Sequence, residues 1–278
     1  MVTLQPMACG SYTVSFDRTL LMGVLNVTPD SFSDGGLFFD EETAVTHAQH
    51  MVRDGADIID VGGESTRPGS ASLSAKEELE RVLPVVTRLA HELSVPISID
   101  TYKPAVAKAC LKAGAHLVND ISGLSNPEMV TLIAKHDVPV IIMHMQGTPT
   151  NMQNHPTYED VIKEINMFFH ERITLARNGG IKKVIIDPGI GFGKTLEHNL
   201  LIFKHLDAFA THGCPLLVGP SRKSFIGKIT GLPPQERLEG TIAAVTVAVM
   251  NGAQIVRVHD VKECKRAIQV ADAIRGVQ

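Results

Sequence analysis

The chain has 278 residues, of which 44% are hydrophobic and 20% are charged, and these fractions exclude a disordered, collagen-like or low-complexity protein. Its 26 Lys and Arg against 30 Asp and Glu give a net charge of −4, which provides no electrostatic reason to expect nucleic acid or an anionic membrane as a partner. The four cysteines are too far apart for a disulfide framework, and neither a secretory signal nor an apolar run of membrane-spanning length is present, so we expect a cytoplasmic protein.

Short runs rich in Ile, Val and Leu recur along the chain, each followed by a turn of Gly, Pro or Asp and then by an amphipathic helical pattern. Residues 1–17 precede these runs and contain an alternating segment, which we expect to form a small hairpin at the bottom of the fold. The eight candidate strands are residues 21–27, 57–62, 96–101, 116–120, 138–145, 183–188, 215–220 and 254–259.

The helical patterns between these strands carry start signals. Ser74 with Glu77 has the spacing of a capping box, and Asp260 with Glu263 predicts the same arrangement for the last helix. Pro104 suits the first position of another helix, because proline tolerates the missing amide hydrogen bond there.

Eight strands that alternate with helices, and are apolar on both faces, favour parallel pairing under a helical cover. A closed (βα)8 barrel, the TIM-barrel architecture, fits this count. An open doubly wound sheet would usually offer five or six strands and one Gly-rich nucleotide turn. Because no linker divides the chain, we predict an α/β protein with one domain over residues 1–278.

Polar residues fall at the ends of the predicted strands, where barrels place their catalytic groups. Alternation puts Asp100 on the inward face of its strand, while Ile97 and Ile99 face the helices. Asp and Asn also cap helices, but an arginine inside a strand must meet an anion. The residues predicted to converge on one mouth are Asn26, Asp100, Asn119, Asp187, Arg257 and His259.

Four loops follow these strands and are candidates for function. Residues 189–195 are rich in glycine but fit neither a Walker nor a dinucleotide pattern, so their glycines permit either close approach to a flat ligand or a tight turn. Residues 28–36 and 62–70 are long enough for mobile lids, although plain surface connections remain an alternative. Residues 221–225 follow the seventh strand, where barrels often bind phosphate.

Taken together, these segments resemble the dihydropteroate synthase family, with matching motifs in the expected order from about residue 20 to residue 265. The resemblance implies a homodimeric TIM-barrel transferase of folate biosynthesis. Such an enzyme joins (7,8-dihydropterin-6-yl)methyl diphosphate to p-aminobenzoate, giving 7,8-dihydropteroate and pyrophosphate. The segments that carry the resemblance are NVTPDSFSDGG (26–36), GGESTRPG (62–69), IDTYKP (99–104), NDISG (119–123), DPGIGFGK (187–194) and SRKS (221–224).

The resemblance also implies roles for individual residues. The pterin pocket would consist of Asp100, Asn119, Asp187 and Lys223. The diphosphate site would consist of Asn26, Arg257 and His259, with Asn26 also a ligand of Mg2+, which commonly takes its other oxygens from water and substrate phosphates. The p-aminobenzoate pocket would consist of Thr66, Arg67, Pro68, Phe192, Ser221 and Lys223. The catalytic residues would be Asp34, Asp100, Lys223, Arg257 and His259, acting in a dissociative substitution.

Two other functions compete with this interpretation. A pterin-binding methyltransferase would share the Asp and Asn residues but would need no diphosphate site. A catalytically silent barrel would bind a partner through the predicted helix 242–250, which is apolar nearly all round. We interpret that helix instead as the contact between two copies of the chain.

Overall fold

The computed structural model describes residues 4–28, 41–65, 70 and 72–277. Eight strands form one parallel sheet in the order β8-β7-β6-β5-β4-β3-β10-β9. A parallel bridge between Ile186 and Leu216 joins the two ends of this order, so the sheet closes into a barrel. The predicted (βα)8 barrel is therefore confirmed. The strands are β3 (Leu20–Asn26), β4 (Ile58–Gly62), β5 (Ile97–Asp100), β6 (Leu117–Asp120), β7 (Val140–Met143), β8 (Val184–Asp187), β9 (Leu217–Val218) and β10 (Ile255–Val258).

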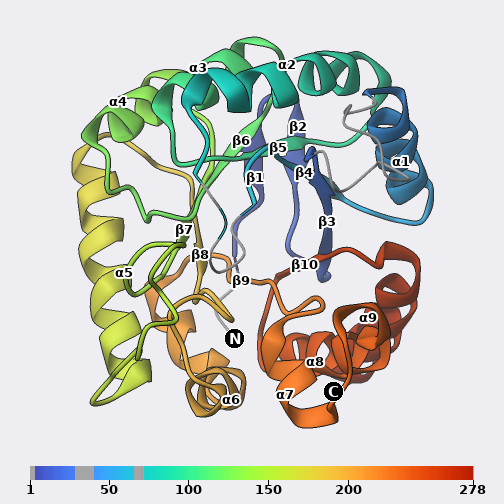
Figure 1. The fold of residues 1–278 in the computed structure, drawn as a ribbon, viewed down its shortest axis with the longest axis vertical. Coiled ribbons are helices and arrows are strands. Elements are labelled where there is room, and N and C mark those ends of the chain that lie inside the picture. The colour runs from blue at the N-terminus through green and yellow to red at the C-terminus, as the bar shows by residue number, and fades with distance from the viewer. Residues whose placement is uncertain (1–3, 29–40, 66–69, 71, 278) are drawn as a thin grey trace.

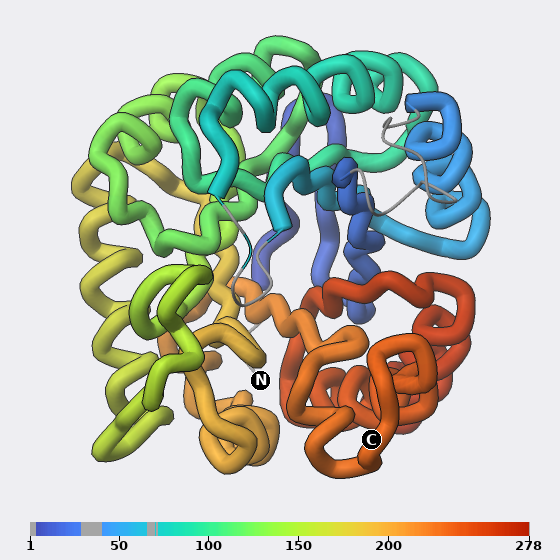
Figure 2. The backbone as a smooth tube through the Cα atoms, in the orientation of Figure 1, coloured from blue at the N-terminus to red at the C-terminus, as the bar shows by residue number. Residues whose placement is uncertain are grey.

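Helices surround the strands on the outside (Figure 1). The backbone winds around the barrel in chain order, which brings the last βα unit beside the first, where β10 pairs with β3 (Figure 2). The α-helices are α1 (Glu41–Arg53), α2 (Ala75–Glu92), α3 (Pro104–Lys112), α4 (Pro127–His136), α5 (Val161–Asn178), α6 (Leu196–Lys204), α7 (Ser224–Thr230), α8 (Leu238–Met250) and α9 (Val261–Gly276). The described residues also form the short 3-10 helices η2 (Leu206–His212) and η3 (Pro234–Glu236).

The predicted helix starts meet different outcomes. Ser74 and Glu77 form the expected capping box of α2, and α3 begins at Pro104. Asp260 lies at the N-cap position of α9, but its side chain makes no capping hydrogen bond, so that prediction is wrong. The Asp260 carboxylate instead accepts two hydrogen bonds from Arg222. The side chain of Arg222 comes from the loop after β9 and occupies the carboxylate oxygens of Asp260, which would otherwise accept from the first N–H groups of α9.

Strand alternation separates two apolar layers. The outer layer lies between strands and helices and includes Ile97 and Ile99, as predicted. The inner layer fills the lower barrel and includes Leu117 and Ile185. The N-terminal hairpin, β1 (Met7–Cys9) paired antiparallel with β2 (Tyr12–Val14), packs against this inner layer. Apolar contacts therefore fill the bottom of the barrel, and the polar site must lie at the opposite end.

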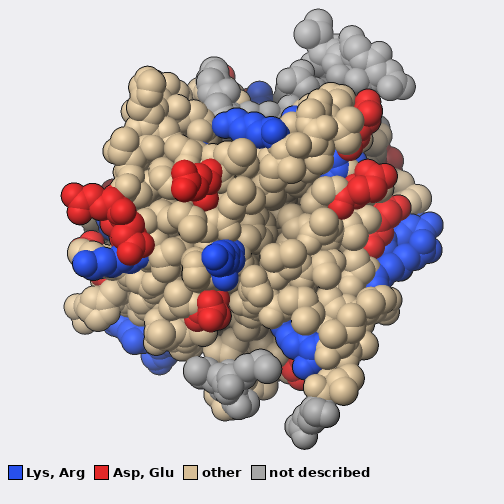
Figure 3. Space-filling view, turned by 90° about the horizontal axis from the view of Figure 1, so that it is seen from below, with Lys and Arg blue, Asp and Glu red and all other residues tan. Residues whose placement is uncertain are grey.

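Charged side chains of both signs are interspersed on the face seen in Figure 3, and most of that face is uncharged. This distribution fits the small net charge and provides no basic surface for nucleic acid there. Among the helices that the structure describes, none combines the length and apolar character needed to cross a bilayer.

Candidate functional site

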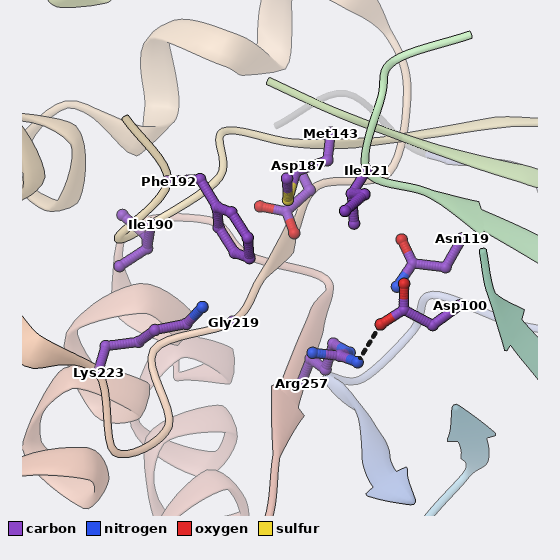
Figure 4. A pocket seen from close by; sticks show the side chains of 10 residues that line it. All are labelled: Asp100, Asn119, Ile121, Met143, Asp187, Ile190, Phe192, Gly219, Lys223 and Arg257. Atoms are coloured by element: carbon purple, nitrogen blue, oxygen red, sulfur yellow. Dashed lines mark hydrogen bonds and ion pairs between the residues drawn. The ribbon is translucent and has the colours of Figure 1, made fainter. Parts of the chain in front are cut away.

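A pocket lies at the carboxyl ends of the strands, and side chains from six strands or the loops that follow them line it (Figure 4). Four of the six residues predicted at the mouth are present, while Asn26 and His259 are not among the lining residues. In Figure 4, Phe192 and Lys223 lie on one side of the pocket and Asp100 and Asn119 on the other. The lining residues are Asp100, Asn119, Ile121, Met143, Asp187, Ile190, Phe192, Gly219, Lys223 and Arg257.

Arg257 meets its anions within the chain itself. Its Nε donates to Oδ2 of Asp60 at 2.6 Å, and its Nη2 donates to Oδ2 of Asp100 at 2.7 Å. Asn119 Nδ2 donates to the same oxygen of Asp60 at 3.0 Å. Burial opposes the charge of Arg257, but the two carboxylates outweigh burial and raise its pKa. The guanidinium is therefore permanently charged and already oriented when a substrate arrives.

Asp60 is a site residue that the sequence analysis missed. Its side chain is fully buried in the middle of β4, and its Oδ1 atom has no hydrogen-bond partner among the described residues. It shares the inward face with Ile58, so the alternation that identified Asp100 could also have identified Asp60. A lone carboxylate on the inward face of an apolar strand was the available signal.

Two carboxylates of the pocket have pKa values near neutrality. Burial raises the pKa of Asp100 to about 7, although Arg257 counteracts part of this effect. Burial also raises the pKa of Asp187 to about 6, and the backbone N–H of Gly189 donates to its Oδ1 at 2.8 Å. Asp187 is therefore mostly ionised at physiological pH and can accept hydrogen bonds from a donor-rich heterocycle, whereas Asp100 titrates close to that pH and already accepts a hydrogen bond from Arg257. Strongly shifted carboxylates in one cleft are typical of functional sites.

The turn after β9 directs Lys223 into the pocket. Arg222 has a left-handed backbone conformation with φ of 56°, and its side chain is paired with Asp260 at 2.5 Å. Arg237 donates to the backbone carbonyls of Arg222 and Lys223. Lys223 Nζ lies 4.0 Å from the centroid of the Phe192 ring. Burial, and then repulsion by Arg257, lowers the pKa of Lys223 to about 8, so this ammonium is charged at pH 7.

Ser221 and His259 form a pair beside this turn. Ser221 Oγ lies 2.9 Å from Nδ1 of His259, and the backbone N–H of His259 donates to Ser221 Oγ at 3.2 Å. Burial, and then the charge of Arg257, lowers the pKa of His259 to about 4. His259 is thus neutral at pH 7 in this structure, and it would serve an anion as a hydrogen-bond donor rather than as a cation.

Asn26 ends β3 and is half-buried. It pairs in register with Gly62, which in turn pairs with Asp100, so it lies on the same rim of the barrel. Its carboxamide has no hydrogen-bond partner within the described part of the chain. No group of three or more His, Cys, Asp or Glu residues among the described positions could hold a metal ion. Among the described residues, Asn26 would therefore bring one oxygen to Mg2+, and water or substrate would supply others.

Four predicted site residues, Asp34, Thr66, Arg67 and Pro68, lie outside the described residues. Of the second long loop, the structure describes the beginning. Glu64 there contacts the ammonium of Lys103, which also contacts the buried carboxylate of Glu78. The sequence alone predicted no role for these residues, and the ion pairs fix the beginning of the loop to α2 and to the turn before α3.

The glycines of the loop after β8 allow two segments of backbone to pack closely. Gly189 and Gly193 have positive φ angles of 69° and 58°. A Cβ atom at Gly189 would lie 1.9 Å from the carbonyl oxygen of His144, and one at Gly193 would lie 2.5 Å from that of Gln146. The sequence left two interpretations open for these glycines, close approach to a flat ligand or a tight turn. At Gly189 and Gly193 the tight turn holds, because the atoms nearest to an added Cβ belong to the connection after β7.

Comparison with known proteins identifies relatives along nearly the whole chain. A family model described as pterin binding enzyme matches residues 22–259. The dihydropteroate synthase of Synechocystis is 51% identical over 261 residues, which cover 92% of this chain and 90% of the relative.

Solved structures agree with this result. The Yersinia pestis dihydropteroate synthase in a sulfonamide drug complex superimposes with a TM-score of 0.94 at 47% identity, covering 98% of this chain and all of the other. The Xanthomonas albilineans dihydropteroate synthase, solved with 4-aminobenzoic acid, gives a TM-score of 0.93 at 42% identity, covering 99% of this chain and all of the other. The same enzyme has also been solved with 7,8-dihydropteroate.

Proposed function

The chain belongs to the dihydropteroate synthase family of pterin-binding enzymes, which are transferases, and from this premise we propose that it makes 7,8-dihydropteroate in folate biosynthesis. Its substrates would be (7,8-dihydropterin-6-yl)methyl diphosphate and p-aminobenzoate, and its second product would be pyrophosphate. The observation that carries the proposal is one pocket in which Asp100, Asn119 and Asp187 lie within reach of Lys223 and Arg257. Hydrogen-bond acceptors for a heterocycle and cations for the anionic groups of both substrates are therefore available together.

Recognition of the pterin would depend on Asp187 and Asn119. A pterin edge presents amide and amino groups in a fixed array, and a buried carboxylate with a carboxamide can match such donors and acceptors. Asp187 is 7% exposed and Asn119 is 4% exposed, so hydrogen bonds made there would face little competition from water. Lys223 would complete this pocket.

The chemistry would be a dissociative substitution. The C–O bond to the diphosphate breaks first, its electron pair leaves with the diphosphate oxygen, and the methylene cation is delocalised into the dihydropterin ring. The amine of p-aminobenzoate then forms the C–N bond with its lone pair and loses a proton to solvent. It needs no strong base, because an arylamine is already neutral at pH 7. Catalysis would be mainly electrostatic, with the Asp100 carboxylate stabilising the cation.

Arg257, His259 and Asn26 would serve the leaving diphosphate. The donor set fits a magnesium ion held by the Asn26 oxygen and substrate oxygens, and such an ion would neutralise part of the charge on the leaving group. Arg257 would share its guanidinium between the diphosphate and its two carboxylate partners. His259 would donate from the ring nitrogen that does not face Ser221.

The p-aminobenzoate site would include Phe192, Ser221 and Lys223, together with Thr66, Arg67 and Pro68, and Asp34 would help to stabilise the cation. Support for this site comes from the contact between Lys223 and the Phe192 ring, which combines an apolar surface with a cation for the carboxylate of the substrate.

The proposal includes a homodimer in the cytoplasm. Helix α8 is apolar on nearly all sides, and Val247 and Met250 on it remain exposed although α9 packs against the same helix. A second copy of the chain would cover these side chains. The four cysteines are buried and free, which fits a reducing compartment.

The proposed function is tested by pyrophosphate release with both substrates, with each substrate omitted in turn, and with and without Mg2+. We expect release only when both substrates and Mg2+ are present. The variant Arg257→Ala should weaken pterin diphosphate binding and turnover by at least about tenfold each, because a charge-assisted hydrogen bond is worth about 1.5–3 kcal/mol. Unchanged affinity and turnover in this variant would remove the diphosphate assignment, and no release by the wild type would remove the function.

A further inference from the structure

Three consecutive backbone carbonyls in the loop after β8 each accept a hydrogen bond from a side chain. The carbonyls are those of residues 191–193. Their donors, in that order, are Gln153 at 2.8 Å, Lys194 at 2.9 Å and the Tyr158 hydroxyl at 2.8 Å. Two of the donors belong to the long connection between β7 and α5, to which the proposed reaction assigns no task. This connection therefore holds the loop that carries Phe192.

Lys194 is the buried centre of these contacts, with 2% of its surface exposed. Besides the Phe192 carbonyl, its Nζ contacts Nδ1 of His144 at 3.0 Å and the His144 carbonyl at 3.2 Å. The three hydrogens of an ammonium thus have three acceptors. Burial lowers the pKa of His144 to about 2, so its imidazole is neutral and can accept. Burial also lowers the pKa of Lys194 to about 7, and the three acceptors match the charged form.

The contacts converge on the residue that forms one wall of the pocket. The backbone N–H of Phe192 donates to the Gly189 carbonyl at 3.0 Å, and its carbonyl accepts from Lys194. Both backbone polar groups of Phe192 are therefore fixed, and its ring lies beside Lys223 on one side of the pocket (Figure 4). Asp187, at the start of the loop, has its own support from β8 and from the N–H of Gly189.

We propose that Gln153, Tyr158 and Lys194 are positioning residues, together called the carbonyl clasp, which hold Phe192 in place and so determine the affinity for p-aminobenzoate without touching it. This inference rests on the proposed function. Because the clasp holds the Phe192 side of the pocket and not Asn119 or Asp100, the pterin substrate should bind almost independently of it. Small displacements of a group that orients a substrate are known to have large kinetic effects.

The test measures both KM values and kcat by pyrophosphate release for Lys194→Met, Tyr158→Phe and Gln153→Ala. We expect KM for p-aminobenzoate to rise about tenfold or more in Lys194→Met, which loses hydrogen bonds from a buried charged group. The rise should be about threefold in Tyr158→Phe, which loses a half-buried neutral hydrogen bond, and less than about twofold in Gln153→Ala, which loses an exposed one. The assay is run at pH 8, because the charge of Lys194 lowers the pKa of Asp187 and this carboxyl must stay ionised when that charge is removed. At this pH, KM for the pterin diphosphate should stay within about twofold in all three variants, because none of them removes a hydrogen bond of the pterin-binding side chains.

Lys228→Met is the matched control. Lys228 is exposed and lines the same outer hollow of about 330 Å³ as Gln153 and Lys194, but it makes no contact with the loop carbonyls. Its removal takes one positive charge from the hollow and should leave both KM values unchanged.

The inference is overturned if the wild type is active but Lys194→Met and Tyr158→Phe leave KM for p-aminobenzoate unchanged, or raise both KM values equally as a general loosening would. If Lys194→Met does not fold, Tyr158→Phe decides alone, since it removes a single oxygen. A wild type that binds both substrates but releases no pyrophosphate would instead contradict the proposed function.

Discussion

Asp187 illustrates how burial sets the chemistry of a single side chain. In the free protein its pKa is raised from 3.8 to about 6, mainly by burial. Below about pH 6 the carboxyl is therefore protonated in the folded protein, and its hydroxyl would oppose the N–H donors of a pterin. Binding of the pterin must then release a proton from Asp187. Titration of this carboxyl therefore makes pterin affinity rise with pH up to about 6 and has no further effect above that pH.

We therefore expect pterin affinity of the wild type to fall by about tenfold per pH unit below pH 6 on account of Asp187. Asp187→Asn should bind the pterin at least about tenfold more weakly at pH 7.5, because the amide presents a donor where an acceptor is needed. Below pH 6, the affinity of this variant should fall less steeply with pH than that of the wild type, because binding to the variant releases one proton fewer. Calorimetric titration from pH 5 to pH 8 measures both quantities.

The control for this variant is its thermal unfolding. A carboxylate whose folded pKa is raised disfavours folding above its unfolded pKa of 3.8, increasingly so up to about pH 6, and removing it should not lower Tm at pH 7.5. If Asp187→Asn binds the pterin within about threefold of the wild type, a difference in binding free energy under about 0.7 kcal/mol, Asp187 does not recognise the pterin.

Residues that act through another residue are harder to find in a sequence than residues that face the pocket. Asp100 and Asp187 could be predicted in the pocket from two facts, that alternate side chains of a strand point inward and that both residues lie at the end of a strand. It did not reveal that Arg257 would meet Asp60, because a pairing across the barrel depends on the register of strands that are distant in sequence. Nor did it show that His259 would be neutral, because desolvation depends on the packing around the imidazole.

The loop after β8 depends on glycine for two separate reasons. Gly189 has a left-handed backbone, and a side chain there would also collide with the His144 carbonyl at 1.9 Å. Gly213, which follows η2, has a similar φ of 65° but no heavy atom within 4 Å of an added Cβ. The two positions therefore separate the cost of the backbone conformation from the cost of the collision.

We expect Gly213→Ala to lower the free energy of unfolding by about 1–2 kcal/mol, the cost of a left-handed conformation for a residue with a Cβ. Gly189→Ala should lower it by at least about 2 kcal/mol more, because backbone must also move. Urea unfolding measures both values. Equal losses in the two variants would mean that the loop relaxes freely and is not packed tightly against the connection after β7.

The fold could be predicted from local sequence patterns, whereas the site could be predicted from them only in part. Each strand was recognisable by itself, and eight such strands with intervening helices admit few arrangements, so the barrel and its hairpin were predictable. The clasp was not, because Lys194 and Tyr158 gain their partners only when the connections after β7 and β8 meet. Contacts between loops have no periodicity that a sequence could display.

The apolar surface of α8 and α9 leads to a prediction about assembly. Val247 and Met250 on α8 and Val270 and Ile274 on α9 are large exposed apolar side chains on two helices that pack together. Stable dimers bury such surface, and a charge placed in it opposes association because it must be desolvated. Light scattering should therefore show a wild-type dimer at micromolar concentration, and Val247→Glu should need at least about tenfold more protein to dimerise.

The matched control is Met167→Glu, which adds the same charge at another exposed apolar side chain, on α5, a helix that α6 separates from α8 around the barrel (Figure 1). This variant should remain dimeric at the concentration where Val247→Glu dissociates, since its charge stays in water on a face that we do not assign to the interface. A monomeric wild type, or equal dissociation of both variants, would place the contact elsewhere or exclude it. Retention of the far-UV circular dichroism spectrum in both variants would show that any dissociation arises from the interface and not from unfolding.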